Sequence, residues 1–472
     1  MPMDADLAEL SATELHELTL KGDVTAVEIV EASLERIERY NPRLNAVVTL
    51  SETALDDART LDAERSKGKE PGLLFGLPAG IKDVTPVAGM RTTFGSPMYA
   101  DYVPDTDALV VRRLRDAGAV IVGKTNCPEF AAGGNTWNEV FGRTCNPWDT
   151  SRSAGGSTGG GAVGLATGMI KLAEGTDLGG SLRIPASFCG VLGLRPSPGL
   201  VPTHPTDFLW DNLQVTGPMA RTARDVALML QAVSGPSELS PMAQPNLDRN
   251  YVGATTNPSA KNLRLAYCPD IAGIGVDRDV EHVCRRAAFE LNQAGAVVEE
   301  VNIDLSYGRD AFIALRGLWM VAHQHTRLQR RDELGVNVRA NIELGLDVTT
   351  EQLAAAEHDR ARVRYFFRDL FEKYDHLLTP AMAVPPFPVE QNYPETVAGK
   401  KMETYIDWIA PTFVLSLTAL PVAAVPCGVD GQGLPVGLQV VGRPFGEEAV
   451  LRLAAVIEQQ CPMPQPPLDL IS

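Results

Sequence analysis

The sequence predicts an α/β fold in which a central mixed β-sheet is covered by helices on both faces. Short apolar runs such as LFGLPAGI and AVIV alternate with amphipathic stretches such as ALVVRRLRDAG between Leu74 and about Gly235. The same alternation returns near the C-terminus at HLLTP and LPVGLQVV. The 472 residues are 44% apolar and 21% charged, which suffices for a large ordered core. We therefore expect residues 1–472 to form one domain.

The N-terminal region, residues 1–70, is expected to be mainly helical. Capping-box patterns over residues 11–14 and 25–28 each precede apolar residues at helical spacing. Glycine tolerates the left-handed conformation that ends many helices, so the first helix should end at Gly22. The second should end at Asn41-Pro42, because proline disfavours helical continuation.

The sheet core is expected over residues 74–235. Residues 236–260 are rich in Pro, Ser and Asn and should form a long surface connection. Beyond it, NLRLAY and AVVEEV are predicted strands on either side of a helix over 280–293, and a largely helical region follows over 310–373. Because sheet elements flank that region, residues 300–405 are expected to be a variable insert that forms the substrate pocket.

The net charge argues against nucleic acid as a ligand. The chain carries 42 basic and 59 acidic side chains, and 42 − 59 gives −17 at pH 7. A membrane span is not expected either. The 22 uncharged residues from Trp408 to Val429 are long enough to cross a bilayer, but three prolines interrupt them. A buried helix over 411–419 followed by a buried strand over 421–425 explains this segment better.

Neither a metal nor a cofactor is expected. The seven cysteines show no CxxC pair and no zinc-like spacing, and His323 and His325 would diverge on a helix. The cysteines are expected to be reduced and mostly buried. The N-terminal sequence MPMDADLAEL lacks the basic and apolar parts of a secretory signal. Together these features predict a cytoplasmic protein.

Three motifs match familiar signatures but have the wrong surroundings. Residues 118–125 satisfy the P-loop pattern, yet AVIV between the glycines has the β-branching of a buried strand. Residues 159–164 satisfy GxGxxG, but polar loop rather than a strand precedes them. Residues 155–159 satisfy the GxSxG nucleophile elbow around Ser157, and the required strand is again missing.

The remaining signal is a concentration of Gly and Ser in SRSAGGSTGGGAVGLATGM and EGTDLGGSLRIPASFCG. A linker would not need the Asp, Arg, Pro and apolar runs that these segments contain. Backbone N–H groups of Leu178, Gly179, Gly180 and Ser181 could converge on one oxygen, because the two glycines adopt conformations that side chains forbid.

These segments resemble the amidase signature family of serine hydrolases. The resemblance extends from about Ser11 to Gln459 and departs at Thr158, where many members have a second serine. Five blocks carry it in the family's order: GLPAGIKD (76–83), GKTN (123–126), GGSTGG (155–160), GTDLGGSLRIP (175–185) and LPVGLQVVG (434–442). The resemblance implies the amidase-signature α/β fold.

The resemblance also implies a Ser–cis-Ser–Lys triad, with Ser181 as nucleophile, Ser157 as bridging serine and Lys82 as base. A serine hydroxyl needs a neighbouring proton acceptor before it attacks, and lysine accepts only when neutral. Its reference pKa of about 10.4 must therefore fall, which burial among apolar residues would cause. The apolar run before Lys82 is compatible with such burial.

Other site residues follow from the same resemblance. The N–H groups of residues 178–181 would form the oxyanion hole, and Asp177 and Arg183 would support that loop. Ala131, in FAAGGN, should line the acyl pocket together with Ser157. The insert and the segment TPAMAVPPFP (379–388) should form the wall of the pocket that determines specificity. Four side chains of the insert are candidates for this wall, although they could equally be core residues: Trp319, Met320, Tyr365 and Phe366.

The leading functional hypothesis is a metal-free and cofactor-free amidase, a hydrolase of small neutral or aryl amides that works through an acyl-enzyme on Ser181. A carbamate or a hydrazide could use the same triad, since a motif identifies the reaction centre and not the substrate. The second hypothesis is the glutamine-hydrolysing component of a tRNA-dependent amidotransferase. A regulatory pseudoenzyme and a GxSxG esterase with a histidine base are further alternatives. The expected partner is a small molecule, and the resemblance leaves a homodimer as an option.

Overall fold

Strands from both halves of the chain hydrogen-bond into one mixed sheet in the computed structural model, which describes residues 6–245 and 247–471. Its strands are β1 (Val47–Leu50), β2 (Pro78–Lys82), β3 (Val120–Thr125), β6 (Leu172–Asp177), β7 (Leu192–Arg195), β8 (Val215–Ala220), β9 (Arg264–Tyr267), β10 (Val297–Glu300), β11 (His376–Pro380), β14 (Val422–Val429) and β15 (Pro435–Val441). The 11-stranded order is β1-β3-β2-β6-β8-β7-β14-β15-β11-β9-β10. Two separate hairpins pair β4 (Trp137–Asn138) with β5 (Gly142–Arg143) and β12 (Thr396–Val397) with β13 (Lys400–Lys401).

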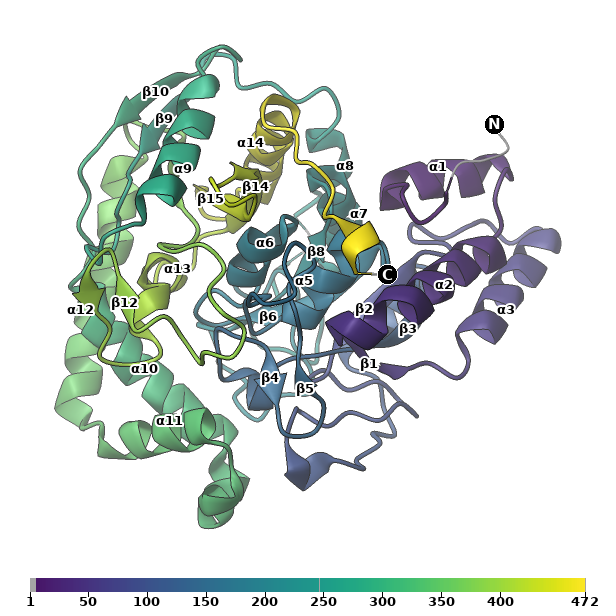
Figure 1. Ribbon diagram of the computed structural model, residues 1–472, viewed down its shortest axis with the longest axis horizontal. Helices are drawn as coiled ribbons and strands as arrows, with labels where there is room; N and C mark the ends of the chain where they lie inside the picture. The colour runs from purple at the N-terminus through teal and green to yellow at the C-terminus, as the bar shows by residue number, and fades with distance from the viewer. Residues whose placement is uncertain (1–5, 246, 472) are drawn as a thin grey trace.

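Helices accompany this sheet along the whole chain (Figure 1). They are α1 (Ala12–Lys21), α2 (Ala26–Leu44), α3 (Ala54–Ser66), α4 (Leu109–Asp116), α5 (Gly159–Ala166), α6 (Arg183–Cys189), α7 (Ala223–Val233), α8 (Tyr251–Ala254), α9 (Arg278–Glu290), α10 (Gly308–His323), α11 (Val336–Asp347), α12 (Thr350–Leu370), α13 (Ala410–Ser416) and α14 (Glu447–Gln460). Short 3₁₀ helices are η1 (Pro97–Tyr99), η2 (Glu129–Ala131), η3 (His325–Glu333), η4 (Asp407–Ile409) and η5 (Leu468–Leu470).

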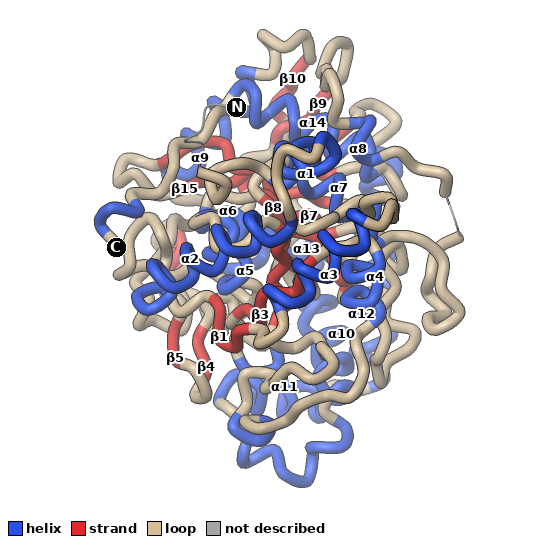
Figure 2. The backbone as a smooth tube through the Cα atoms, turned by 90° about the vertical axis from the view of Figure 1, so that its right-hand side faces the viewer, coloured by secondary structure: helices blue, strands red, loops and turns tan. Residues whose placement is uncertain are grey.

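The two faces of β3 pack into two different hydrophobic clusters. Along β3, Val120 and Val122 join the cluster that contains α2, α3 and α5, whereas Ile121 joins the cluster that contains α4, α7, α9 and α14. This alternation is what a strand covered on both faces requires. In Figure 2 the strands run through the middle of the molecule between helices. The predicted α/β sheet with helices on both faces is confirmed.

Residues 6–70 contain the helices α1, α2 and α3. Both capping boxes form, and Gly22 ends α1 in the left-handed conformation with φ of 80°. The expected end of α2 at Asn41-Pro42 is wrong, because the helix continues to Leu44 and is capped by Asn45 with φ of 51°. The short strand β1, which pairs antiparallel with β3, was not predicted.

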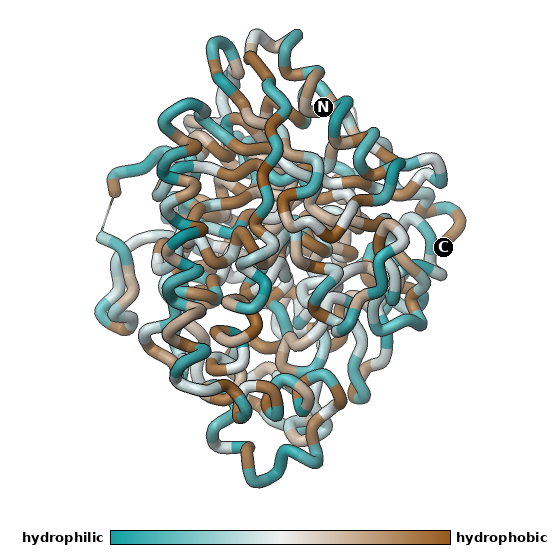
Figure 3. The backbone as a smooth tube through the Cα atoms, turned by 90° about the vertical axis from the view of Figure 1, so that its left-hand side faces the viewer, coloured by the Kyte–Doolittle hydropathy of each residue, from teal (hydrophilic) through white to brown (hydrophobic). Residues whose placement is uncertain are grey.

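The helical insert contains α10, α11 and α12 and lies at the left in Figure 1. Hydrophilic residues gather at its lower tip in Figure 3. The uncharged run after Trp408 forms the short buried helix α13 and then the strand β14, as expected. Within residues 6–245 and 247–471, no helix combines the length and the apolarity that a membrane crossing needs. The division of residues 1–472 into a single domain stays a prediction.

The three rejected motifs lie in other structures than their signatures require, and the GxSxG pattern around Ser157 lies in bends before α5 rather than after a strand. Val120–Thr125, the centre of the formal P-loop, is the buried strand β3, and Gly118 precedes it with φ of 90°. Gly159–Ala166 is helix α5, which follows bends and turns rather than a strand. The predicted surface connection over 236–260 contains the short helix α8 among its described residues. Residue 246 of this connection lies outside the described residues, and so do residues 1–5 of the N-terminal sequence.

Candidate active site

Lys82 is the last residue of β2 and its side chain is fully buried. Its ammonium nitrogen Nζ donates a hydrogen bond to Ser157 Oγ at 2.7 Å and another to Thr176 Oγ1 at 3.0 Å. The fold thus brings together two residues that lie 75 positions apart in the chain. Thr176, in β6, was not predicted, although it lies inside the GTDLGGS block.

Burial lowers the pKa of the Lys82 ammonium to about 8. Three groups act in the opposite direction and favour the charged form, namely Cys127, Glu174 and Asp177. Burial prevails because a charged ammonium loses its hydration when it is enclosed by protein. A substantial fraction of Lys82 is therefore neutral slightly above neutral pH and can accept a proton.

Ser157 lies at the end of a tight loop that leads into α5. The peptide bond between Gly156 and Ser157 is cis, and the Ser157 side chain is fully buried. A Cβ atom at Gly156 would lie 2.8 Å from the Gly133 carbonyl oxygen, so only glycine fits there. The loop can therefore approach the backbone of the FAAGGN segment closely.

Ser181 is the accessible member of the predicted triad. Of the residues from Ser153 to Cys189, all of which the structure describes, only Ser181 is not buried. Its carbonyl oxygen accepts a hydrogen bond from the Thr158 N–H at 3.3 Å, which joins its loop to the one that carries Ser157. A substrate could reach the Ser181 side chain while Lys82 and Ser157 stay shielded from water.

Asp177, the last residue of β6, holds the loop around Ser181. Its two carboxylate oxygens accept hydrogen bonds from the N–H groups of Gly180 at 2.9 Å and Leu182 at 3.1 Å. The buried guanidiniums of Arg183 and Arg195 contact the same carboxylate at 2.9 and 3.2 Å. Burial favours the neutral acid, but the two guanidiniums outweigh it and hold the pKa of Asp177 well below its usual range.

One of the four predicted oxyanion-hole donors already has an acceptor within the protein. The Gly180 N–H donates to Asp177 Oδ1 at 2.9 Å, so this group is engaged within the loop. Gly180 is required for another reason: its φ is 125°, and a Cβ atom would lie 2.3 Å from Thr412 Oγ1. Within the described chain, no hydrogen bond occupies the N–H groups of Leu178, Gly179 and Ser181. Those three stay the candidates.

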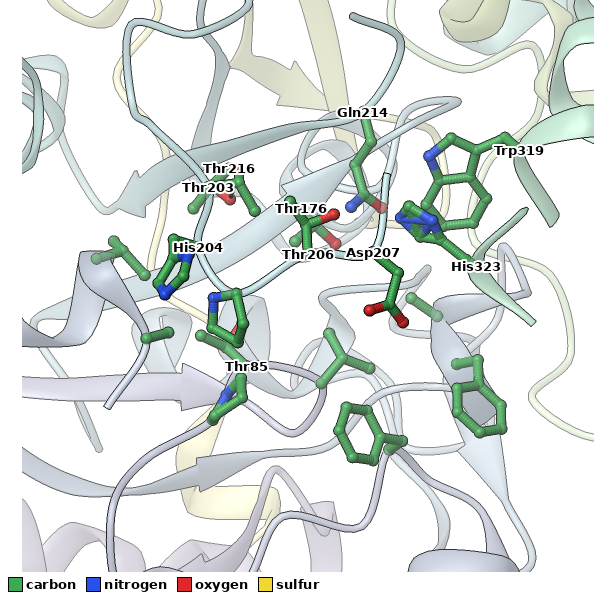
Figure 4. Close-up of a pocket in the computed structure, with 18 of the residues that line it drawn as sticks. Thr85, Thr176, Thr203, His204, Thr206, Asp207, Gln214, Thr216, Trp319 and His323 are labelled. Carbon is green, nitrogen blue, oxygen red and sulfur yellow. Dashed lines mark hydrogen bonds between the residues drawn. The ribbon is translucent and has the colours of Figure 1, made fainter. Parts of the chain in front are cut away.

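A cavity of about 210 Å³ is the candidate substrate pocket (Figure 4), and Lys82, Ser157 and Ser181 are not among the residues that line it. Thr176, which binds Lys82, lines it together with Ala131, the predicted pocket residue. Phe130 and Ala131, the last two residues of η2, have φ of 45° and 59°, so the chain turns sharply there. Residues from the turn after β2, the loop after β7 and α10 complete the wall, among them Thr85, His204, Asp207, Gln214, Trp319 and His323.

The insert contributes to this cavity through α10, Gln324 and Arg327 of η3. The Trp319 ring lies 3.9 Å from that of His323, and its Nε1 donates to Asp211 Oδ2 at 2.6 Å. The other three candidates do not line it: Met320 is buried in the core, Phe366 packs on that core and Tyr365 is 57% exposed. The segment 379–388 also lies outside the lining. Helical spacing could not distinguish these positions.

Comparisons with known proteins agree on one family. The family model described as Amidase matches residues 28–451. A glutamyl-tRNA(Gln) amidotransferase subunit from Moorella thermoacetica is 35% identical, with 96% of this chain and 97% of that protein covered. The acylamidase of Rhodococcus erythropolis is 34% identical, with 96% of both chains covered. The crystal structure of a bacterial aryl acylamidase superposes with a TM-score of 0.89 at 26% identity, covering 96% of both chains.

Proposed function

The chain belongs to the amidase family, and from that premise we propose that it hydrolyses the C–N bond of small aryl or neutral amides through an acyl-enzyme on Ser181. The observation that carries the proposal is the 2.7 Å hydrogen bond between the buried Lys82 Nζ and Ser157 Oγ. The neighbouring Thr158 N–H donates to the carbonyl of the more accessible Ser181. Together they supply a nucleophile, a proton relay and a base.

In the proposed reaction, neutral Lys82 accepts the proton of Ser157 while Ser157 accepts that of Ser181. The freed Ser181 oxygen attacks the substrate carbonyl, and the developing oxyanion is stabilised by the N–H groups of Leu178, Gly179 and Ser181. The relay then returns the proton to the nitrogen, since an amine leaves far more easily than an amide anion. Water attacks the acyl-enzyme by the same relay and releases the acid.

The cavity lining supports an aromatic substrate group. The faces of Phe94, Phe130 and Trp319 are large and apolar, and aromatic rings pack on such faces favourably. A carbamate or a hydrazide of the same arylamine differs only in the atoms that flank the carbonyl, so it would meet the same lining. A carbamate would release CO₂ with an alcohol and the amine.

The decisive experiment compares amine release from an aryl acetamide and an aryl carbamate that share one aniline. We expect turnover of the acetamide and its loss in Ser181→Ala. Equal or faster turnover of the carbamate, also lost in the variant, would assign a urethane hydrolase. Turnover that persists in Ser181→Ala would contradict the proposal.

Activity should depend on pH through Lys82. The base works only when neutral, and its pKa is about 8, so kcat/KM for a neutral amide should rise with pH and level off above about 8. Below that pH, the rate should fall about tenfold per unit. A pH profile with a non-ionising substrate checks this. A flat profile from pH 6 to pH 9 would contradict Lys82 as the base.

Trp319 should contribute to substrate binding more than to chemistry. Replacing it with Leu removes the aromatic face and the hydrogen bond to Asp211, so KM for an aryl amide should rise about tenfold with little change in kcat. Tyr365→Leu is the matched control, since Tyr365 is exposed outside the cavity. Equal effects of the two substitutions would contradict a role for Trp319 in the pocket.

The second candidate is the glutamine-hydrolysing component of an amidotransferase. The 35% identity to the amidotransferase subunit from Moorella thermoacetica over nearly the whole chain favours it. Such a protein would work within a complex, so the purified chain should hydrolyse simple amides poorly until its partners are added. Rapid hydrolysis of aryl amides by the purified chain would exclude this candidate.

A further inference from the structure

A second buried lysine and two buried carboxyls lie around the base. The register of the sheet pairs Ile81, the neighbour of Lys82, with Lys124 in β3 and with Glu174 in β6. Lys124 and Glu174 are both fully buried. Asp83, also buried, lies 3.8 Å from Lys124 Nζ. Buried charges are costly unless they are paired, so this cluster requires an explanation beyond packing.

Glu174 and Lys124 both bind the turn that follows Lys82. Glu174 Oε1 accepts a hydrogen bond from Thr85 Oγ1 at 3.0 Å, and Lys124 Nζ donates to the Thr85 carbonyl at 2.5 Å. Thr85 therefore lies between the buried carboxyl and the buried ammonium. It also lines the cavity, where Figure 4 shows it below Thr176.

Glu174 contacts Lys82 directly as well. Its other oxygen, Oε2, accepts a hydrogen bond from the Lys82 backbone N–H at 3.2 Å. One carboxyl group thus fixes both the residue that carries the base and the turn that borders the cavity. Neither Ser157 nor Ser181 needs this group for its own hydrogen bonds, so its contacts serve the lysine end of the relay.

We propose that Glu174 is a positioning residue for Lys82, which orients the base and sets the pH at which it becomes neutral. This inference rests on the function proposed above. The carboxylate holds the strand end through Lys82 N–H and Thr85, and its negative charge favours the ammonium over the neutral amine.

The charged groups around Lys82 determine whether a substitution of Glu174 raises or lowers the pKa of Lys82. The groups that act on Lys82 are Glu174 and Asp177 from β6 and Cys127 from the segment after β3. Burial is the largest effect on Glu174 itself and raises the pKa of its carboxyl above the usual value, and the charges of Lys82 and Lys124 offset this only in part. Because removing a nearby negative charge destabilises an ammonium, a neutral residue at position 174 should lower the pKa of Lys82.

The test measures the pH dependence of Ser181 labelling by a fluorophosphonate. The Ser181 oxygen bonds to phosphorus, fluoride leaves, and the serine proton passes through the relay. In the parent chain, the labelling rate should rise with pH to a plateau. In Glu174→Gln, the amide oxygen can accept from the Lys82 N–H while the amide NH2 donates to Thr85 Oγ1, which then accepts instead of donating. The rise should therefore move to lower pH by about one unit. In Glu174→Leu, which keeps neither, the same shift should accompany an about tenfold lower plateau.

Glu447→Gln is the matched control, because Glu447 is another buried glutamate that accepts a backbone N–H, from Ser197 at 2.7 Å. Its profile should match that of the parent. An unshifted profile in the neutral variants at position 174, or a shift to higher pH, would overturn the inference alone. No labelling of Ser181 in the parent at any pH would overturn the proposed function, and the inference with it.

Discussion

Replacing Ser181 with Ala should lower kcat/KM for an aryl amide by about 10⁴-fold or more, without unfolding the chain. Ser181 is the only residue between Ser153 and Cys189 that is not buried, and its hydroxyl is the proposed nucleophile, so without it no covalent acyl intermediate can form there. Each protein is mixed with an aryl acetate and the reaction is quenched rapidly. Mass spectrometry of the protein should then show an acyl adduct on the parent and none on the variant.

Ser157→Ala tests whether Ser157 transfers protons or is itself the nucleophile. Ser157 bridges to Lys82 in the structure, so its loss should cost about 10² to 10⁴ in rate while Ser181 can still be acylated slowly. A nucleophile-elbow esterase would behave in the opposite way, with the acyl group on Ser157. Peptide mapping of the adduct decides between them, and an adduct on Ser157 would refute the proposed mechanism.

Replacing Asp177 with Ala should destabilise the fold by about 3–5 kcal/mol. The substitution leaves the guanidiniums of Arg183 and Arg195 buried without their carboxylate, and it frees the loop that carries Ser181. Urea denaturation monitored by circular dichroism measures the change. Activity should fall too, because the Gly180 and Leu182 N–H groups lose the acceptor that shapes this loop.

Asp56→Ala is the control for this substitution, because Asp56 forms an ion pair with Arg59 on the surface, where both side chains are largely exposed. Its cost should be less than about 1 kcal/mol. The pKa of Asp177 is held below its usual range, so its contribution is complete at neutral pH and is lost only as the pH falls through that lowered value. A similar loss of unfolding free energy in the two variants would contradict the stabilising role of the buried network around Asp177.

The elements that the sequence predicted correctly are those with local causes. The capping boxes before α1 and α2 form because the cap and the third helical residue are neighbours in the chain. The run AVIV is a strand because β-branched residues suit a sheet buried on both faces. Elements that depend on contacts with distant parts of the chain were not predicted from neighbouring residues. The strand β1, VVTL, contains β-branched residues typical of strands, but four residues are too few to show an alternating pattern, and the strand pairs with β3 at the edge of the sheet.

The candidate active site divides in the same way. The chemistry of Lys82, Ser157 and Ser181 could be proposed from the sequence, since motif blocks carry residue types and their order. The engagement of the Gly180 N–H by Asp177 and the choice of Trp319 over Tyr365 as a cavity residue could not, because both depend on the direction in which a group points.

By itself, then, the sequence determined the α/β class, the motif blocks and the residue types that an acyl-transfer site needs. Only the tertiary structure decided that Lys82 Nζ reaches Ser157 Oγ at 2.7 Å, and that Glu174 and Lys124 meet at Thr85. The physical reason is that a pKa and a hydrogen bond depend on distance and burial. Residues separated by 75 and 92 positions become neighbours only when β2 and β6 pair and the loop before α5 closes over them.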